Sequence, residues 1–276
     1  MSAASRFFKR IARRIRTIVA PIPEISSALW LQTVQRHGFL AALPLPDQAK
    51  LRALSALFLQ HKEFTGAHGL VVTDAMAVSI AAQACLPLLH WGAPKQALAW
   101  YDDFVGIVVH PAEALARRKA VDEAGVVHHY NEVLLGEAME HGPVMLSWPA
   151  VDHAGQGGHA SSVVIHEFMH KIDMRNGTAD GCPPLPPGFL GQTGARAAHA
   201  AWRGAWKPAY EHFREQVIIA ERFGGAWPWL DAYGATAPAE FFAVACEAYF
   251  VDSPRFAQEF PTLAPVLNAF FQPGTG

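Results

Sequence analysis

One short segment, VVIHEFMHKID at positions 163–173, limits most strongly how this 276-residue chain can fold. It places His166 and His170 four residues apart, with Glu167 directly after the first histidine. On an α-helix this spacing leaves about 40° of rotation between the two side chains, so both imidazoles project from one face. An apolar run precedes the pair and an Asn-Gly stop signal follows it. The segment therefore predicts a helix over about residues 159–174.

This arrangement of side chains suits a zinc ion. The spacing lets one nitrogen of each histidine reach the ion at about 2.0–2.1 Å. Glu167 would lie beside the metal, where it can take a proton from a zinc-bound water and pass it to the leaving amine. The ion lowers the pKa of that water to about 7 and polarises the carbonyl of the scissile peptide bond. The sequence therefore predicts a zinc metallopeptidase with one Zn²⁺ per chain and Glu167 as the general base.

A catalytic zinc needs a third protein ligand, and a later segment offers two candidates. Glu240 and Glu247 are seven residues apart, so both lie on one face of a largely apolar predicted helix. One carboxylate can bind zinc while the other accepts an N–H from a ligating histidine, and the spacing does not choose between them. Asp173 is a further candidate for such a second-layer contact. Its alternative role is a hydrogen bond to the turn at residues 176–177.

Two separated blocks carry a family resemblance. HEFMHKIDMRNG at positions 166–177 and DAYGATAPAEFFAVACEAYF at positions 231–250 occur in this order. Together they resemble the Mlc titration factor A family of bacterial zinc peptidases. The resemblance covers about residues 40–272.

The resemblance implies roles for particular residues. In the family pattern, His166, His170 and Glu240 bind zinc and Glu167 is the general base, a gluzincin-like HExxH site with a downstream glutamate ligand. The family's site and catalytic core are similar to those of anthrax toxin lethal factor, where a tyrosine seven residues before the glutamate ligand faces the metal. Tyr233 has that position here. It would stabilise the oxyanion of the tetrahedral intermediate.

The resemblance also implies a regulatory partner. Members of the family bind the glucose repressor Mlc, relieve repression of sugar-transport genes and show aminopeptidase-type activity on small substrates. We therefore expect a peptide or protein substrate, with possible aminopeptidase action and a repressor of the Mlc type as partner. The alternative is a regulator-binding protein that sequesters a transcription factor, with the zinc site secondary.

Composition limits the class of protein. The chain is 51% hydrophobic and 17% charged, which excludes a disordered chain and is typical of a globular protein with a buried core. A net charge of −2 provides no overall attraction to nucleic acid, so no direct nucleic-acid partner is expected. The 3 cysteines are scattered and cannot form a disulfide framework. Because free cysteines are typical of a reducing compartment, a cytoplasmic location is expected.

Basic residues are concentrated at the start of the chain. Six of the 22 Lys and Arg residues lie within residues 1–20, which contain no acid. As a helix, this segment would separate its arginines from an apolar stripe. We expect residues 6–16 either to make weak contact with an anionic membrane or to form a solvated, frayed terminus. The predicted division is a basic N-terminal arm at residues 1–35 and a zinc metallopeptidase domain at residues 36–276.

Helical patterns flank a few short strand patterns in the rest of the chain. Asp74 is expected to cap an apolar helix over residues 75–86. Strands are expected at residues 69–72, 104–109, 126–135 and 144–148, and further helices at residues 195–223 and 237–251. The last two strands flank a turn and predict a small sheet. Helices, then a few strands, then helices predict a mainly helical α+β fold.

Overall fold

The computed structural model describes residues 24–112, 114–121, 127–134, 136–139, 141–156, 158 and 160–273. The predicted membrane contact at residues 6–16 lies outside these residues, and so does the basic arm up to residue 23. The predicted boundary at residue 35 falls inside helix α2 (Ser27–Arg36), which buries Trp30 and Val34 and packs on helix α5 (Asp74–Cys85). A separate basic arm therefore remains a prediction for the residues before Glu24.

Helices make up most of the described chain. Besides α2 and α5 they are α3 (Gly38–Ala41), α4 (Leu45–His61), α6 (Pro94–Leu98), α7 (Trp148–Asp152), α8 (Val163–Asp173), α9 (Ala195–Phe223), α10 (Pro238–Val251), α11 (Ser253–Glu259) and α12 (Ala264–Phe271). The predicted helices at 75–86, 159–174, 195–223 and 237–251 correspond to α5, α8, α9 and α10. The expected cap of α5 is displaced by one residue, because the Thr73 hydroxyl, not Asp74, accepts the Met76 N–H at 3.3 Å. Within the described residues, no helix has both the length and the apolarity needed to span a membrane.

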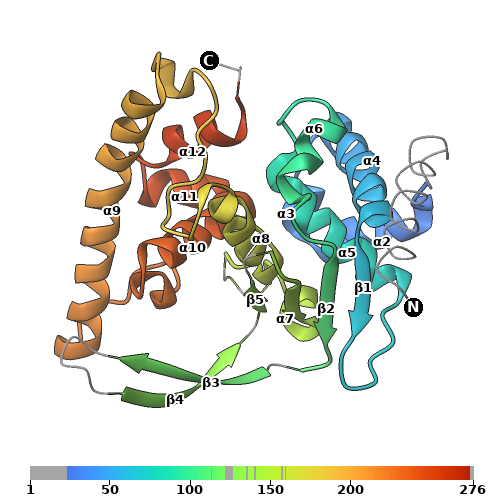
Figure 1. Cartoon of the computed structure of the whole chain (residues 1–276), viewed down its shortest axis with the longest axis horizontal. Helices are drawn as coiled ribbons and strands as arrows, with labels where there is room; N and C mark the ends of the chain where they lie inside the picture. The colour runs from blue at the N-terminus through green and yellow to red at the C-terminus, as the bar shows by residue number, and fades with distance from the viewer. Residues whose placement is uncertain are drawn as a thin grey trace, which may run out of the picture.

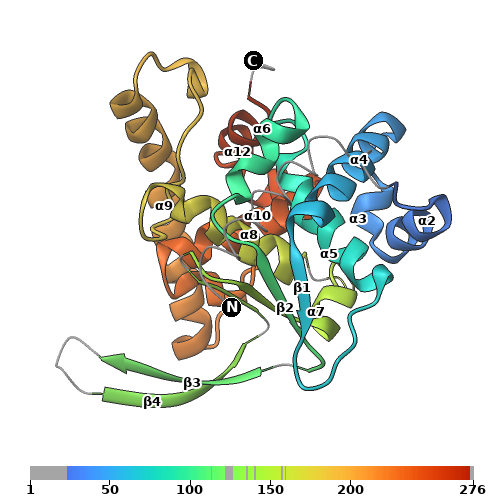
Figure 2. The same cartoon turned by 45° about the vertical axis from the view of Figure 1, so that its right-hand side comes forward.

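The strands form a small sheet and a separate hairpin. The sheet order is β1 (Glu63–Gly66), β2 (Gly106–His110), β6 (Val144–Ser147) and β5 (Gly136–Ala138). The first three strands are parallel, and β5 pairs antiparallel with β6. The hairpin consists of β3 (Ala114–Val121) and β4 (Val127–Leu134), and it projects from the body in both views (Figures 1 and 2).

Two strand predictions are corrected by this topology. The strand expected at residues 69–72 is wrong: β1 lies earlier, and the Leu70 N–H closes a turn onto the Ala67 carbonyl at 2.9 Å, with Gly69 at a φ of +80°. This φ lies in the left-handed region, where glycine has no steric penalty. The strands at 126–135 and 144–148 do form, but they do not pair with each other. β4 pairs with β3, while β6 lies between β2 and β5.

Helix α8 lies at the centre of the molecule (Figure 1). It packs against α10, α5, β5 and β6. On one side its Phe168 meets Tyr101, with ring centroids 4.8 Å apart. On the other side α10 packs its Phe241 against Trp206 of α9, with ring centroids 5.6 Å apart. The predicted mainly helical α+β fold is confirmed, and its core holds α8 and α10 side by side.

Candidate metal centre

Helix α8 presents two histidines from one face. The Ser162 hydroxyl accepts the Ile165 N–H at 3.2 Å and so caps the start of this helix. The ring centroids of His166 and His170 are 4.9 Å apart, as expected for side chains one turn apart. The remaining faces of α8 are buried in the core. Packing of these apolar faces fixes the direction in which the histidines point.

Glu240, in the first turn of α10, completes a group of three donors. Its Oε2 lies 3.0 Å from Nε2 of His166 and 3.2 Å from Nε2 of His170. The two Nε2 atoms are themselves 3.2 Å apart. Burial raises the pKa of Glu240, but its hydrogen bonds with the two histidines outweigh this effect and hold the pKa below its ordinary value. Three donors from two helices therefore converge on one point.

This geometry fits a metal ion. Two imidazole nitrogens and one carboxylate oxygen are a donor set found at catalytic zinc sites. Ligands at 2.0–2.1 Å from a tetrahedral ion are separated from one another by about 3.3 Å, close to the separations between these atoms. The local field also favours a cation: burial lowers the pKa of His166, but hydrogen bonds with Glu240 and Glu247 outweigh it and raise that pKa well above its ordinary value. The negative charge of these two glutamates would also stabilise a bound metal ion.

Glu247 lies on the opposite side of the His166 ring from Glu240. Its Oε1 is 2.7 Å from Nδ1 of His166, and its Oε2 accepts the backbone N–H of Ser162 at 2.7 Å. The two carboxylates that spacing could not distinguish therefore contact different nitrogens of His166. Glu240 faces the point where the donors converge, and Glu247 holds the other nitrogen.

Glu167 is buried beside this point and faces a glycine. Burial raises the pKa of Glu167 to about 7, although the nearby histidines act in the opposite direction. A Cβ added to Gly136 of β5 would lie 2.6 Å from Oε1 of Glu167, closer than atoms can approach. Glycine is therefore required if β5 is to lie this close to the carboxylate.

A buried lysine fixes the same strand to α8. The Nζ atom of Lys171 donates to the carbonyl oxygens of Met139 and Gly142, the latter at 2.9 Å, in the turn between β5 and β6. This side chain is fully buried, and it also lies over the ring of Phe104 at 4.6 Å. Lys171 and Gly136 together determine the position of β5 above Glu167.

The structure brings Tyr233 to the site and directs Asp173 elsewhere. Tyr233 lies in the short 3-10 helix η5 (Ala232–Ala235), with its ring centroid 6.1 Å from that of His166. The Oδ2 atom of Asp173 accepts the Gly181 N–H at 2.7 Å instead of bonding the turn at residues 176–177. Burial raises the pKa of Asp173 to about 6. Its Oδ1 and the Nδ1 of His170 are both buried, and neither has a hydrogen-bond partner among the residues that the structure describes.

Three residues around the site were absent from the sequence analysis. Ser162 had a signal, because a serine directly before an apolar helical run is a typical N-cap. Gln83 had a weaker one, since an amide within an apolar helix must find a buried partner. Gly136 had no signal in the sequence, because its role depends on the distance between β5 and α8, which are far apart in the chain.

Comparison with known proteins decides the family. A model of the glucose-regulated metallo-peptidase M90 family matches residues 9–272. The chain belongs to this family. The match begins well before residue 40, where the resemblance in the sequence analysis starts, so it includes part of the N-terminal segment. As an M90 family member, the chain is a metallopeptidase by family, and the three converging donors are its candidate metal ligands.

Several relatives of this M90 member share a name. A protein of Klebsiella pneumoniae (strain 342), named Mlc titration factor A, is 32% identical over 234 residues, covering 84% of this chain and 82% of the relative. Proteins of the same name from Cronobacter sakazakii and Escherichia fergusonii are each 32% identical over 225 residues, covering 81% of this chain and 78% of the relatives.

Proposed function

We propose that this M90 family member is a zinc-dependent peptidase whose ion is held by His166, His170 and Glu240. The observation that carries the proposal is the convergence of two histidine nitrogens and one carboxylate oxygen, all 3.0–3.2 Å from one another, with Glu167 next in sequence to one ligand. When bound, the zinc ion would supply a Lewis acid that acidifies water and polarises a peptide carbonyl.

The chain's own residues then perform the proton transfers. Glu167 accepts a proton from the attacking water and delivers it to the leaving amine. Glu247 accepts a hydrogen bond from Nδ1–H of His166, which keeps Nε2 unprotonated and available as a ligand. The hydroxyl of Tyr233 donates a hydrogen bond to the developing oxyanion, as the similarity to lethal factor implies. These roles are part of the proposal.

The edge of the sheet offers a path for the substrate. Among the described strands, β5 is the last in the sheet order, and it pairs with β6 on one side. An extended peptide can add to such an edge through main-chain hydrogen bonds. Because Gly136 of β5 lies against Glu167, a peptide bound there would pass the general base. We propose this route for both small aminoacyl substrates and longer peptides.

A parallel assay of two glutamate variants tests the peptidase proposal. Zinc-loaded wild type, Glu167→Gln and Glu211→Gln are assayed on free and N-terminally blocked peptide reporters. Glu211 is exposed on α9, so its variant is a matched control. We expect wild type and Glu211→Gln to cleave alike and Glu167→Gln to lose about 10²- to 10⁴-fold in rate. Equal cleavage by wild type and Glu167→Gln would contradict the assignment. Preference for free N-termini would support aminopeptidase action.

The name shared by the relatives favours a second candidate function. Each is called Mlc titration factor A, so we propose as the alternative that this chain binds and sequesters an Mlc-type repressor in the cytoplasm, with the metal site secondary. Binding of purified repressor by Glu167→Gln at wild-type affinity, without cleavage by either protein, would support the alternative. Cleavage of the repressor by wild type alone would support the peptidase.

A further inference from the structure

Gln83 is a buried amide on a helix that contributes no metal ligand. It lies on α5, where neighbouring residues on every side are buried, and its own side chain is fully buried. A buried amide that lacks hydrogen bonds is costly, by about 1–3 kcal/mol for each unsatisfied group. The partners of Gln83 therefore indicate what the amide does.

The amide oxygen of Gln83 leads directly to the metal centre. Oε1 accepts the Ser162 hydroxyl at 2.8 Å. The backbone N–H of the same serine is bonded to Glu247 at 2.7 Å, and Glu247 contacts Nδ1 of His166 at 2.7 Å. Three successive hydrogen bonds thus join α5 to a ligating histidine.

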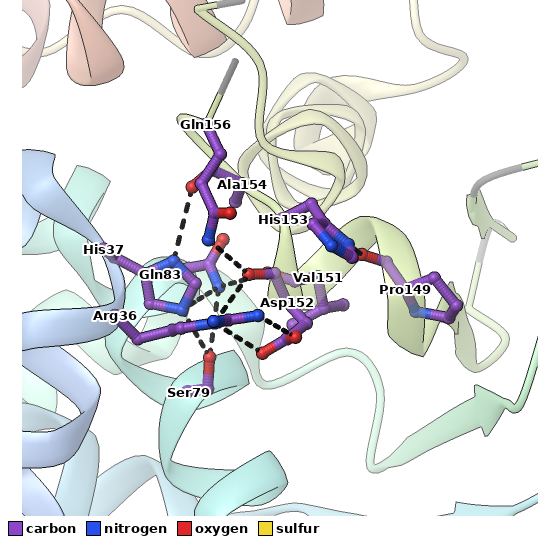
Figure 3. A network of polar contacts seen from close by, with 10 residues as sticks. All are labelled: Arg36, His37, Ser79, Gln83, Pro149, Val151, Asp152, His153, Ala154 and Gln156. Atoms are coloured by element: carbon purple, nitrogen blue, oxygen red, sulfur yellow. Dashed lines mark hydrogen bonds and ion pairs between the residues drawn. The ribbon is translucent and has the colours of Figure 1, made fainter.

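The amide nitrogen anchors the other end of this chain. Nε2 donates to the carbonyl of Val151 and to the hydroxyl of Ser79, each at 3.3 Å. His37 adds a bond between its Nε2 and the same hydroxyl at 2.7 Å, and Figure 3 shows these groups gathered around Gln83. Because the nitrogen side faces acceptors, the oxygen must face Ser162. The orientation of the amide is thereby determined.

Ser162 can serve both of its partners only in one rotamer. Its hydroxyl oxygen accepts the Ile165 N–H to cap α8, while its single hydroxyl proton goes to Gln83. Loss of the Gln83 acceptor would leave that proton buried without a partner. Rotation of the Ser162 side chain toward another partner would disturb the cap of α8. It would also disturb the backbone N–H of Ser162, which holds Glu247.

We propose that Gln83 is a positioning residue of the metal centre, which acts through Ser162 and Glu247 to hold the His166 ring in its ligating orientation. This inference rests on the proposed metal site. It extends the centre to α5, a helix that supplies no metal ligand but fixes the orientation of His166.

Zinc affinity tests the inference, measured by competition with a chromogenic chelator. Gln83→Met keeps the core volume but removes the acceptor, and Thr73→Ala removes a cap of the same helix as a matched control. Removing partners of metal ligands typically costs 10- to 100-fold in affinity. Because Gln83 reaches His166 only through Ser162 and Glu247, we expect a smaller loss of zinc affinity for Gln83→Met, about 3- to 10-fold. Thr73→Ala should bind zinc as wild type does.

A double variant distinguishes positioning from general packing. If Gln83 acts through Glu247, Gln83→Met should weaken zinc binding no further when Glu247→Gln is already present. Wild-type affinity in folded Gln83→Met, or additive losses in the double variant, would overturn the inference. Should Gln83→Met fail to fold, Ser162→Ala interrupts the chain at its next link and is expected to weaken zinc binding likewise. Failure of wild type itself to bind zinc would contradict the proposed metal site instead.

Discussion

Glu167 illustrates the conflict between stability and function at the scale of a single residue. Its carboxylate is buried near the carboxylates of Glu240 and Glu247, and burial raises its pKa to about 7 from an ordinary value of 4.5. In the metal-free protein, the charged form is therefore disfavoured on folding. The same burial brings the carboxylate next to the candidate metal ligands, where the proposed general base has to lie.

This conflict predicts a pH-dependent stability in metal-free protein. Because the folded pKa exceeds the unfolded one, the protonated carboxyl stabilises below about pH 4.5, and this stabilisation is lost as pH rises through about 7. The 2.5-unit difference (7 − 4.5) corresponds to about 3 kcal/mol. Relative to Glu167→Gln, chelator-treated wild type should lose about this free energy of unfolding between pH 5 and 8 in urea titrations. Parallel pH profiles of the two proteins would refute the prediction.

At the scale of elements, the contact between β5 and α8 depends on one missing side chain. Gly136 lets the strand lie against Glu167, while Lys171 holds the following turn to α8. Strand β2, which β6 separates from β5 in the same sheet, also contains a glycine, Gly106, but a Cβ there would meet only Pro143 at an ordinary contact distance of 3.4 Å. The two glycines therefore form a matched pair for mutation.

Alanine at these two positions should have different effects. In Gly136→Ala the new methyl group must displace either the strand or the Glu167 carboxylate, so we expect the peptidase rate to fall at least about tenfold. Gly106→Ala should retain close to wild-type rate. Steady-state hydrolysis and thermal unfolding of both variants would check this. A similar loss of rate in both variants would indicate a general response of the sheet to added volume.

At the scale of the whole molecule, the candidate centre joins distant parts of the chain. Its three donors come from α8 and α10, and the surrounding contacts come from α5, β5 and η5. A bound ion would connect the two central helices, and any ligand that binds only the folded state stabilises that state. Metal occupancy should therefore be visible in global unfolding.

Zinc should raise the melting temperature of the whole chain. At free zinc one hundred times its Kd, the expected stabilisation is about 2.7 kcal/mol. For a protein of 276 residues that corresponds to roughly 5 °C. Calorimetry with zinc and with chelator should show this shift in wild type and lose it in Glu240→Ala. The exposed control Glu211→Gln should keep it. Equal melting temperatures of wild type with and without zinc would contradict a metal centre.

Local patterns alone predicted much of this architecture. The spacing of His166 and His170 and the apolar run before them predicted α8, and the seven-residue separation of Glu240 and Glu247 placed both on one face of α10. These predictions succeed because helical periodicity is a property of neighbouring residues. The prediction of a strand at residues 69–72 was wrong because it, too, rested only on neighbouring residues. A short apolar run does not reveal that a glycine turn, which starts at Ala67, ends inside it.

The sequence by itself determined the donors and their helices, whereas the tertiary structure decided which donors meet. Glu240 lies 74 positions from His166, and only the packing of α10 on α8 selects it over Glu247 for the converging point. The pairing of β6 with β5 and the contact of Gln83 with Ser162 were decided in the same way. The physical reason is that distances between elements depend on how aromatic side chains such as Phe168 and Phe241 fill the core. No periodicity along the chain encodes that packing.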